Sequence, residues 1–197
     1  MERAILARHA ESVFNARGLV NGDPSIPGSL TPSGIEQARA LGEVLAQTPL
    51  DLCVTTEFER VIQTADEALR GRRIPRIVVP GLDDPRLGPF EGATLHDYRE
   101  WARTASSSDS PGGDGESRFE IIGRYARSFR ELLDRREESI LVVAHSLPIS
   151  YVLSALERNE LGSRVPLVPN ATAYPLGADE LEAAVEALDH WLAAPTF

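Results

Sequence analysis

Short apolar runs alternate with amphipathic stretches along most of the chain. The runs are short and rich in β-branched residues, which is typical of buried strands, and they fall at residues 4–7, 52–55, 77–79 and 140–144. Thr31 followed by Pro32 is typical of a helix start, because the hydroxyl can cap free amides and proline lacks an N–H that would be unpaired there. Further helical spacing covers residues 59–69, 117–136 and 179–194. This alternation predicts an α/β domain with a largely parallel sheet.

Two segments need separate treatment. Residues 139–156 carry no formal charge, which raises the alternative of a membrane span. The segment contains His145 and Pro148 and changes from β-branched residues to leucine and alanine, so a strand, a tight turn and a helix explain it better. Residues 104–115 (TASSSDSPGGDG) predict a mobile loop within a variable cap region, residues 85–115. No boundary divides the chain, so we expect a single domain, residues 1–197.

Composition excludes several classes of function. All 20 basic residues are arginine, so mechanisms that need a lysine amine are excluded, among them Schiff-base and P-loop chemistry. The net charge of −10 argues against binding to nucleic acid, although a local basic pocket remains open.

The lone cysteine, Cys53, cannot form an internal disulfide, which favours a reducing compartment. Only four apolar residues separate Arg3 from Arg8, too few for a signal peptide, so we expect a cytoplasmic protein.

Reactive side chains follow each predicted strand. Arg8 and His9 come after the first, Arg60 soon after the second, Asp84 after the third and His145 after the fourth. Ligands bind beyond the carboxyl ends of strands in open parallel sheets, so we expect these residues to meet at one edge. Each also has a plainer interpretation: His145 as a satisfied histidine at a helix start, Arg60 in a surface ion pair, and Asp84 in a solvated turn.

Segments along nearly the whole chain resemble the histidine phosphatase, or phosphoglycerate mutase-like, superfamily. The matching segments are ILARHAESVFN (5–15), LTPSGIEQA (30–38), TTEFERVIQTA (55–65), LDDPRLGPFEG (82–92), GES (115–117), VVAHS (142–146) and the late Asn170. The chain departs from the family at Ala10 and Ser146, where glycine is usual, and at Asp84, where many members have the longer glutamate.

The resemblance implies a three-layer αβα sandwich with a mostly parallel central sheet and phosphoryl transfer through a phosphohistidine. It assigns the nucleophile to His9 and the phosphate contacts to Arg8, Arg60 and His145, which agrees with residue chemistry because imidazole is nucleophilic and guanidinium contacts two oxygens at once. Asp84 would protonate the leaving oxygen and then accept a proton from water.

Asn15, Gly22 and Ser146 would add donors around the phosphate. The resemblance implies no metal and no cofactor, because the arginines and histidines take the metal's place. The expected partner is a small phosphorylated metabolite rather than nucleic acid or a membrane, and a homodimer is left open.

The choice between hydrolase and mutase rests on motifs. Mutases of this family carry E-R-x-Y-G where this chain has DDPRLGPFEG, so a phosphomonoesterase is favoured. The alternatives are a mutase-type phosphotransferase and a phospho-ligand binder without turnover. A second anionic group on the substrate could be read by arginines of the cap region, namely Arg86, Arg99, Arg103 and Arg118.

Overall fold

The computed structural model describes residues 1–158, 161 and 165–197. Its sheet has the strand order β3-β2-β4-β1-β5, in which β5 is antiparallel to β1 and the other pairs are parallel. The strands are β1 (Arg3–Arg8), β2 (Leu52–Thr55), β3 (Arg76–Val78), β4 (Ser139–Ala144) and β5 (Ala173–Gly177).

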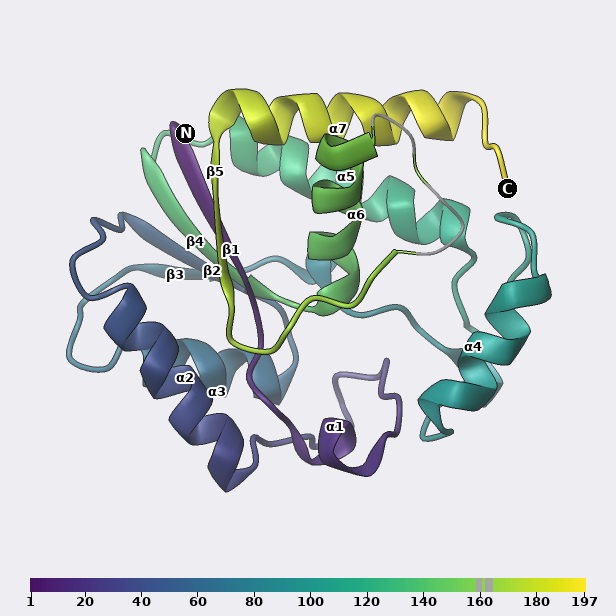
Figure 1. Ribbon diagram of the computed structural model, residues 1–197, viewed down its shortest axis with the longest axis horizontal. Helices are drawn as coiled ribbons and strands as arrows, with labels where there is room; N and C mark the ends of the chain where they lie inside the picture. Colours follow the sequence, from purple (N-terminus) through teal and green to yellow (C-terminus); the bar gives the residue numbers. More distant parts are fainter. Residues whose placement is uncertain (159–160, 162–164) are drawn as a thin grey trace.

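Helices cover both faces of this sheet (Figure 1). One face packs against α2 (Pro32–Val44) and α3 (Glu59–Ala68). The other packs against α5 (Arg118–Leu133), α6 (Ser146–Arg158) and α7 (Ala178–Ala193). The predicted three-layer αβα sandwich is therefore confirmed.

Alternation along β1 shows why its sequence reads as one apolar run. Ala4 and Leu6 lie in the core beneath α5, α6 and α7, whereas Ile5 and Ala7 lie in the core beneath α2 and α3. Successive side chains of a strand point to opposite faces, so a strand covered on both sides needs apolar residues throughout.

The sequence did not predict α1 (Val13–Arg17), α4 (Leu95–Thr104), β5 or the short 3₁₀ helices at Pro80–Leu82 and Gly88–Phe90. β5 contains Pro175, which argues against a strand in sequence but is tolerated here because β5 lies at the edge of the sheet. α4 contains no buried residue, so it carries no core-facing pattern. Its aromatic residues instead pack with Phe90, at ring-centroid distances of 5.7 to 5.8 Å.

The cap region lies beside the layered core rather than within it. In Figure 1, α4 stands apart from the sheet, and no regular element follows it until α5 begins at Arg118. The predicted loop is present at residues 105–115, because Thr104 ends α4, and its mobility stays a prediction. Among the described helices, none combines the length and the apolar character that a bilayer crossing requires.

Candidate active site

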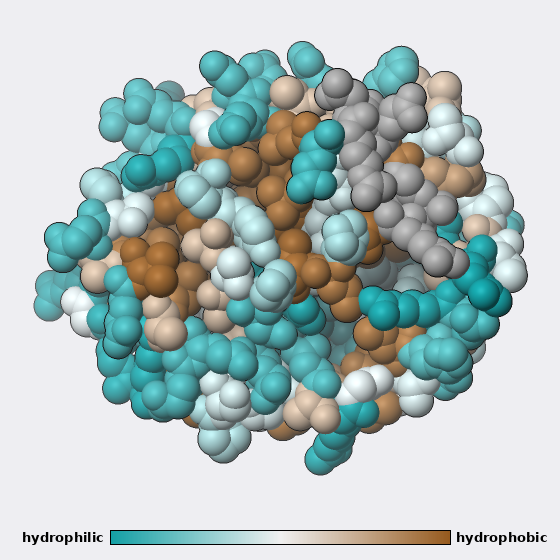
Figure 2. Space-filling model, in the orientation of Figure 1, coloured by the Kyte–Doolittle hydropathy of each residue, from teal (hydrophilic) through white to brown (hydrophobic). Residues whose placement is uncertain are grey.

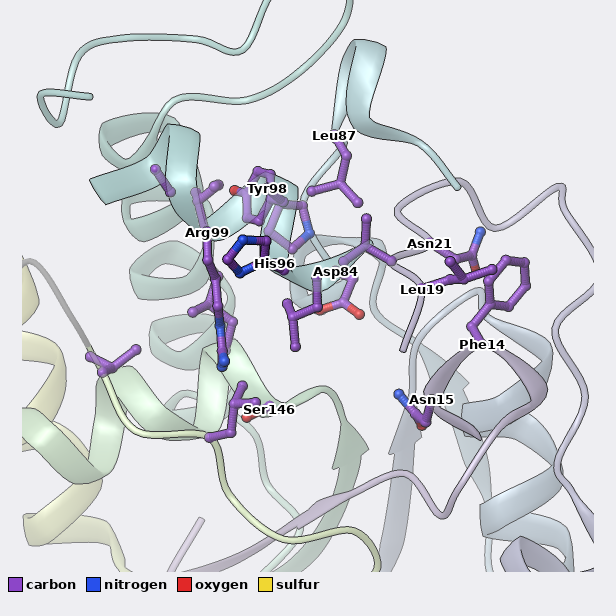
Figure 3. Close-up of a pocket in the computed structure, with 18 of the residues that line it drawn as sticks. Phe14, Asn15, Leu19, Asn21, Asp84, Leu87, His96, Tyr98, Arg99 and Ser146 are labelled. Atoms are coloured by element: carbon purple, nitrogen blue, oxygen red, sulfur yellow. The ribbon is translucent and has the colours of Figure 1, made fainter. Parts of the chain in front are cut away.

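The carboxyl ends of β1, β2 and β4 bring the predicted residues together. A cavity of about 600 Å³ opens at this edge, between the sheet and α4 (Figure 3). The predicted residues that line it are Arg8, His9, Asn15, Arg60, Asp84 and Ser146. His145 lies behind this wall, with its Nδ1 3.1 Å from Asp84 Oδ2.

His9 is held as a neutral imidazole whose Nε2 accepts a hydrogen bond from Arg60. Its Nδ1 lies 2.8 Å from the carbonyl oxygen of Ala10, an acceptor that fixes the proton on Nδ1 and leaves the lone pair on Nε2. Burial, followed by the charge of Arg60, holds the pKa of His9 well below its usual value. The amide of Asn170 donates to the carbonyl oxygen of His9 at 2.8 Å, so the late asparagine fixes the backbone of this residue.

Arg60 connects His9 to the carboxylate of Asp84. This buried guanidinium places its Nε 3.2 Å from His9 Nε2 and its Nη2 2.8 Å from Asp84 Oδ2. Its Nη1 donates to Asn21 Oδ1 at 2.6 Å, and its Cζ lies 4.1 Å from the ring centroid of Phe58. Arg60 is therefore a part of the site rather than a surface ion-pair residue.

One hydrogen-bond donor of the Arg8 guanidinium is unpaired among the described residues. Its Nη1 donates to the carbonyl oxygen of Val168 at 2.7 Å, while its buried Nε has no hydrogen-bond partner among the described residues. A buried unpaired donor is costly, and the Arg8 side chain also lines the cavity, where its positive charge would attract an anion. This arrangement agrees with the predicted contact to phosphate.

His145 is fully buried between two polar side chains. Its Nε2 lies 3.0 Å from Thr56 Oγ1, and its Nδ1 faces the Asp84 carboxylate. A carboxylate can only accept, so this contact favours the tautomer that carries its hydrogen on Nδ1. Burial lowers the pKa of His145, although the negative charge of Asp84 acts in the opposite direction.

Asp84 and its neighbour Asp83 have different roles. Burial raises the pKa of Asp83 to about 7, which would suit a general acid, but its Oδ1 accepts from the backbone of Glu57 and it does not line the cavity. Asp84 does line the cavity, with 26% of its side chain exposed. Geometry therefore favours Asp84, and the shorter aspartate reaches the site.

The free site holds Asp84 as a carboxylate. Burial alone would raise its pKa, but the charge and hydrogen bond of His145 and the charge of Arg60 outweigh burial and hold the pKa well below its usual value. Arg60 stays charged and donates to Asp84 Oδ2 at 2.8 Å, so its contribution favours the carboxylate in either protonation state of His145.

Gly22 corrects one expectation. Its N–H donates to Glu91 Oε2 at 2.8 Å, so it does not point into the cavity as a phosphate donor. A Cβ here would lie 2.0 Å from the carbonyl oxygen of Pro85, so glycine is needed for close packing. Its neighbour Asn21, which sequence reasoning missed, lines the cavity and bridges Glu91 and Arg60.

Asn15 and Ser146 both lie at the cavity (Figure 3). The side-chain oxygen of Asn15 accepts from the backbone of Ser12 at 3.1 Å, which leaves its NH₂ group for a ligand. Ser146 Oγ accepts from the backbone of Val168 at 3.0 Å, so its hydroxyl supports the loop. Neither Ala10 nor Ser146 has a positive φ, which explains why the family's usual glycine is dispensable at both positions.

The described residues include one cluster with metal-ligand atoms. Ligand atoms of His9, Asp84 and His145 all lie within 4.8 Å of one another. Arg60 contacts all three of these side chains, and Arg8 lines the same cavity. Two guanidinium groups repel a cation and attract an anion, so this donor set suits a phosphate better than a metal ion.

The cavity lies at the carboxyl ends of parallel strands and combines a buried imidazole with two guanidinium groups and a carboxylate. This combination is typical of an α/β enzyme that acts on phosphate esters. The comparisons with known proteins agree. The chain belongs to the histidine phosphatase superfamily (branch 1), whose family model matches residues 4–189.

Its relatives include both phosphatases and mutases. The chain is 29% identical to the adenosylcobalamin/alpha-ribazole phosphatase of Salmonella typhimurium, over 78% of this chain and 79% of that protein. It is 32% identical to a 2,3-bisphosphoglycerate-dependent phosphoglycerate mutase of Methylobacterium, over 96% and 99% of the two chains. The crystal structure of the alpha-ribazole phosphatase from Shigella flexneri superimposes with a TM-score of 0.74 at 26% identity, covering 88% of this chain and 89% of that chain.

Proposed function

We propose that this protein is a phosphomonoesterase that transfers the phosphoryl group of a small metabolite to His9 and then to water. The observation that carries the proposal is the corner formed by His9 and Arg60, where a nucleophilic Nε2 lies against a guanidinium and beside a carboxylate. Such a corner attracts the phosphate and presents a nucleophile to phosphorus.

The proposed reaction has two balanced steps. Arg8 and Arg60 hold the phosphoryl oxygens, joined by His145 once its Nδ1 hydrogen turns from Asp84 to the phosphate, while His9 Nε2 attacks, the ester P–O bond breaks, and Asp84 gives its proton to the leaving oxygen. Water then attacks the phosphohistidine, the P–N bond breaks, and Asp84 accepts the proton from water. Arg8 and Arg60 supply the positive charge, so we infer a reaction that needs no metal.

Hydrolysis is favoured over mutase activity because residues 82–92 lack the mutase motif E-R-x-Y-G. We expect the purified protein, in buffer with a chelator, to release phosphate from nitrophenyl phosphate and to form an acid-labile phosphohistidine. The mutase alternative is tested with 3-phosphoglycerate and a bisphosphate primer. If the protein isomerises 3-phosphoglycerate faster than it releases phosphate, it is a mutase and the phosphatase proposal is wrong. If neither turnover nor phosphohistidine is detected, the remaining alternative is a protein that binds a phosphorylated ligand without turnover.

The cavity favours a leaving group that is larger than a simple alcohol and partly apolar. Its volume lies within the range of sites for small organic ligands. The space-filling view shows the surface hollowed beside α4, with apolar residues inside the hollow (Figure 2). The apolar and aromatic side chains that line the cavity are Phe14, Leu19, Val20, Pro85, Leu87, Leu95, Tyr98, Ala102, Ile121, Leu147, Tyr151, Val165 and Leu167.

Arg99 is the cap arginine best placed to read a second anionic group. Arg86 donates to the carbonyl oxygen of Asp114, Arg103 pairs with Glu100, and Arg118 donates to carbonyls at the end of α4. Arg99 forms no hydrogen bond or ion pair with the other described residues. In Figure 3 its side chain reaches from α4 toward Ser146 at the cavity.

We therefore expect Arg99→Gln to raise KM about tenfold for esters whose leaving group carries a carboxylate or second phosphate, because it loses one charge-assisted contact. For nitrophenyl phosphate, KM should stay unchanged. Arg103→Gln is the matched control, since its guanidinium already pairs with Glu100 on the same helix. An equal rise of KM for both classes of ester would show that Arg99 does not read the leaving group.

The cytoplasmic location is also part of the proposal. Cys53 is buried and unpaired, which fits a reducing compartment.

A further inference from the structure

A buried ion pair lies under the loop that carries Asp84. Arg124 of α5 binds Glu116 through two parallel contacts, Nε to Oε1 and Nη2 to Oε2, each at 2.8 Å. The two side chains are 19% and 6% exposed, so water screens the pair little. Parallel contacts of this kind fix direction as well as distance.

The Glu116–Arg124 pair forms hydrogen bonds to the loop backbone on both sides of Asp84. Before it, Arg124 Nη1 donates to the carbonyl oxygens of Gly81 and Asp83, each at 3.0 Å. After it, the N–H of Arg86 donates to Glu116 Oε2 at 2.9 Å. Only Asp84 and Pro85 lie between these attachment points, and proline has little backbone freedom.

Two more contacts hold the loop against α5. The Tyr125 hydroxyl donates to the same Asp83 carbonyl oxygen at 3.1 Å. A Cβ on Gly81 would lie 2.0 Å from Ser128 Oγ, so glycine permits this close approach. None of these groups lines the active-site cavity.

We propose that the Glu116–Arg124 pair is a positioning pair, which sets where the Asp84 carboxyl group lies relative to the leaving oxygen. The inference rests on the proposed function, in which Asp84 is the general acid. Proton transfer requires hydrogen-bond distance, so a small displacement of this loop loses most of the acid's contribution. Attack by His9 does not depend on the loop in the same way, because β1 and α3 position His9 and Arg60.

This role has a signature that a purely structural role lacks. A nitrophenolate leaves readily without a proton, whereas an alkoxide does not, so loss of the acid slows alkyl esters selectively. For Arg124→Gln and Glu116→Gln we expect kcat/KM to fall about 30-fold or more with an alkyl phosphate and less than about threefold with nitrophenyl phosphate. Arg124→Lys should be intermediate, because an ammonium cannot form both parallel contacts.

The control is Arg130→Gln on the same helix. Arg130 pairs with Asp189 at the surface, with both side chains about 45% exposed, and its loss should change neither ester. Equal losses for both esters in the Arg124 and Glu116 variants, or no loss, would overturn the positioning role. If Arg124→Gln does not fold, the Arg124→Lys and Glu116→Gln variants allow the same comparison of alkyl and nitrophenyl esters.

Asp84→Asn separates the two proposals. If Asp84→Asn slows alkyl esters selectively but the Arg124 and Glu116 variants do not, only the positioning role fails. If Asp84→Asn itself shows no difference between the esters, the assignment of the acid fails and the positioning role fails with it. With both roles correct, Arg124→Gln should cost little more in the Asp84→Asn background.

Discussion

Replacing His9 by alanine is expected to lower kcat/KM for nitrophenyl phosphate by about 10⁴-fold or more, because removing a nucleophile removes the covalent route. The side chain makes its backbone hydrogen bond only to the neighbouring residue, so the fold should be retained. Wild-type protein quenched during turnover should carry acid-labile phosphate on histidine, and the variant should carry none.

His190→Ala is the matched control for this variant. His190 is exposed in the last turn of α7 and is not among the residues that line the cavity, so its loss should leave turnover and labelling unchanged. Full activity in His9→Ala would contradict the assignment of the nucleophile. A labelled histidine in that variant would place the phosphoryl group on another residue.

Asp84→Asn is expected to lower kcat/KM for alkyl phosphates by about 10² to 10⁴-fold, the usual contribution of a general acid, and to affect nitrophenyl phosphate much less. Asparagine keeps the size of the side chain and one acceptor for Arg60, so the binding of phosphate should change little. A uniform loss over all leaving groups would instead assign Asp84 a role in holding Arg60.

The pH dependence of the wild type follows from the charge of Asp84. Its pKa lies well below the usual value, so Asp84 is ionised before substrate binds, and the proton must arrive with a monoanionic substrate. Phosphate monoesters lose their second proton near pH ~6. For alkyl phosphates, kcat/KM should therefore be highest below about pH 6 and fall about tenfold per unit above it. A flat profile up to pH ~8 would show that Asp84 keeps its own proton.

When the phosphate arrives, it competes with Asp84 for Arg60. The guanidinium now donates to the carboxylate at 2.8 Å, and phosphate oxygens would take over that donor. A carboxylate that loses this partner and gains a phosphate neighbour is easier to protonate. Under the proposed function, this exchange would let one residue be ionised in the free enzyme and act as an acid in the complex.

The strands and most of the large helices were predictable because their signals are local. Apolar runs and helical spacing follow from burial of one element at a time. β5 and α4 were missed for opposite reasons: β5 exists by pairing with β1 at the edge despite Pro175, and α4 has no buried face. Neither stabilising partner can be seen within the element's own sequence.

The sequence by itself determined the family, through its motifs, and the layered fold. It also predicted which side chains meet at the cavity, because these residues follow strands whose carboxyl ends meet at one edge. Only the tertiary structure decided that Gly22 serves packing, that Asn21 and Glu91 support Arg60, and that Asp84 lies against both Arg60 and His145. Those outcomes depend on contacts between residues far apart in the chain and on the burial of charge, and no local pattern encodes either.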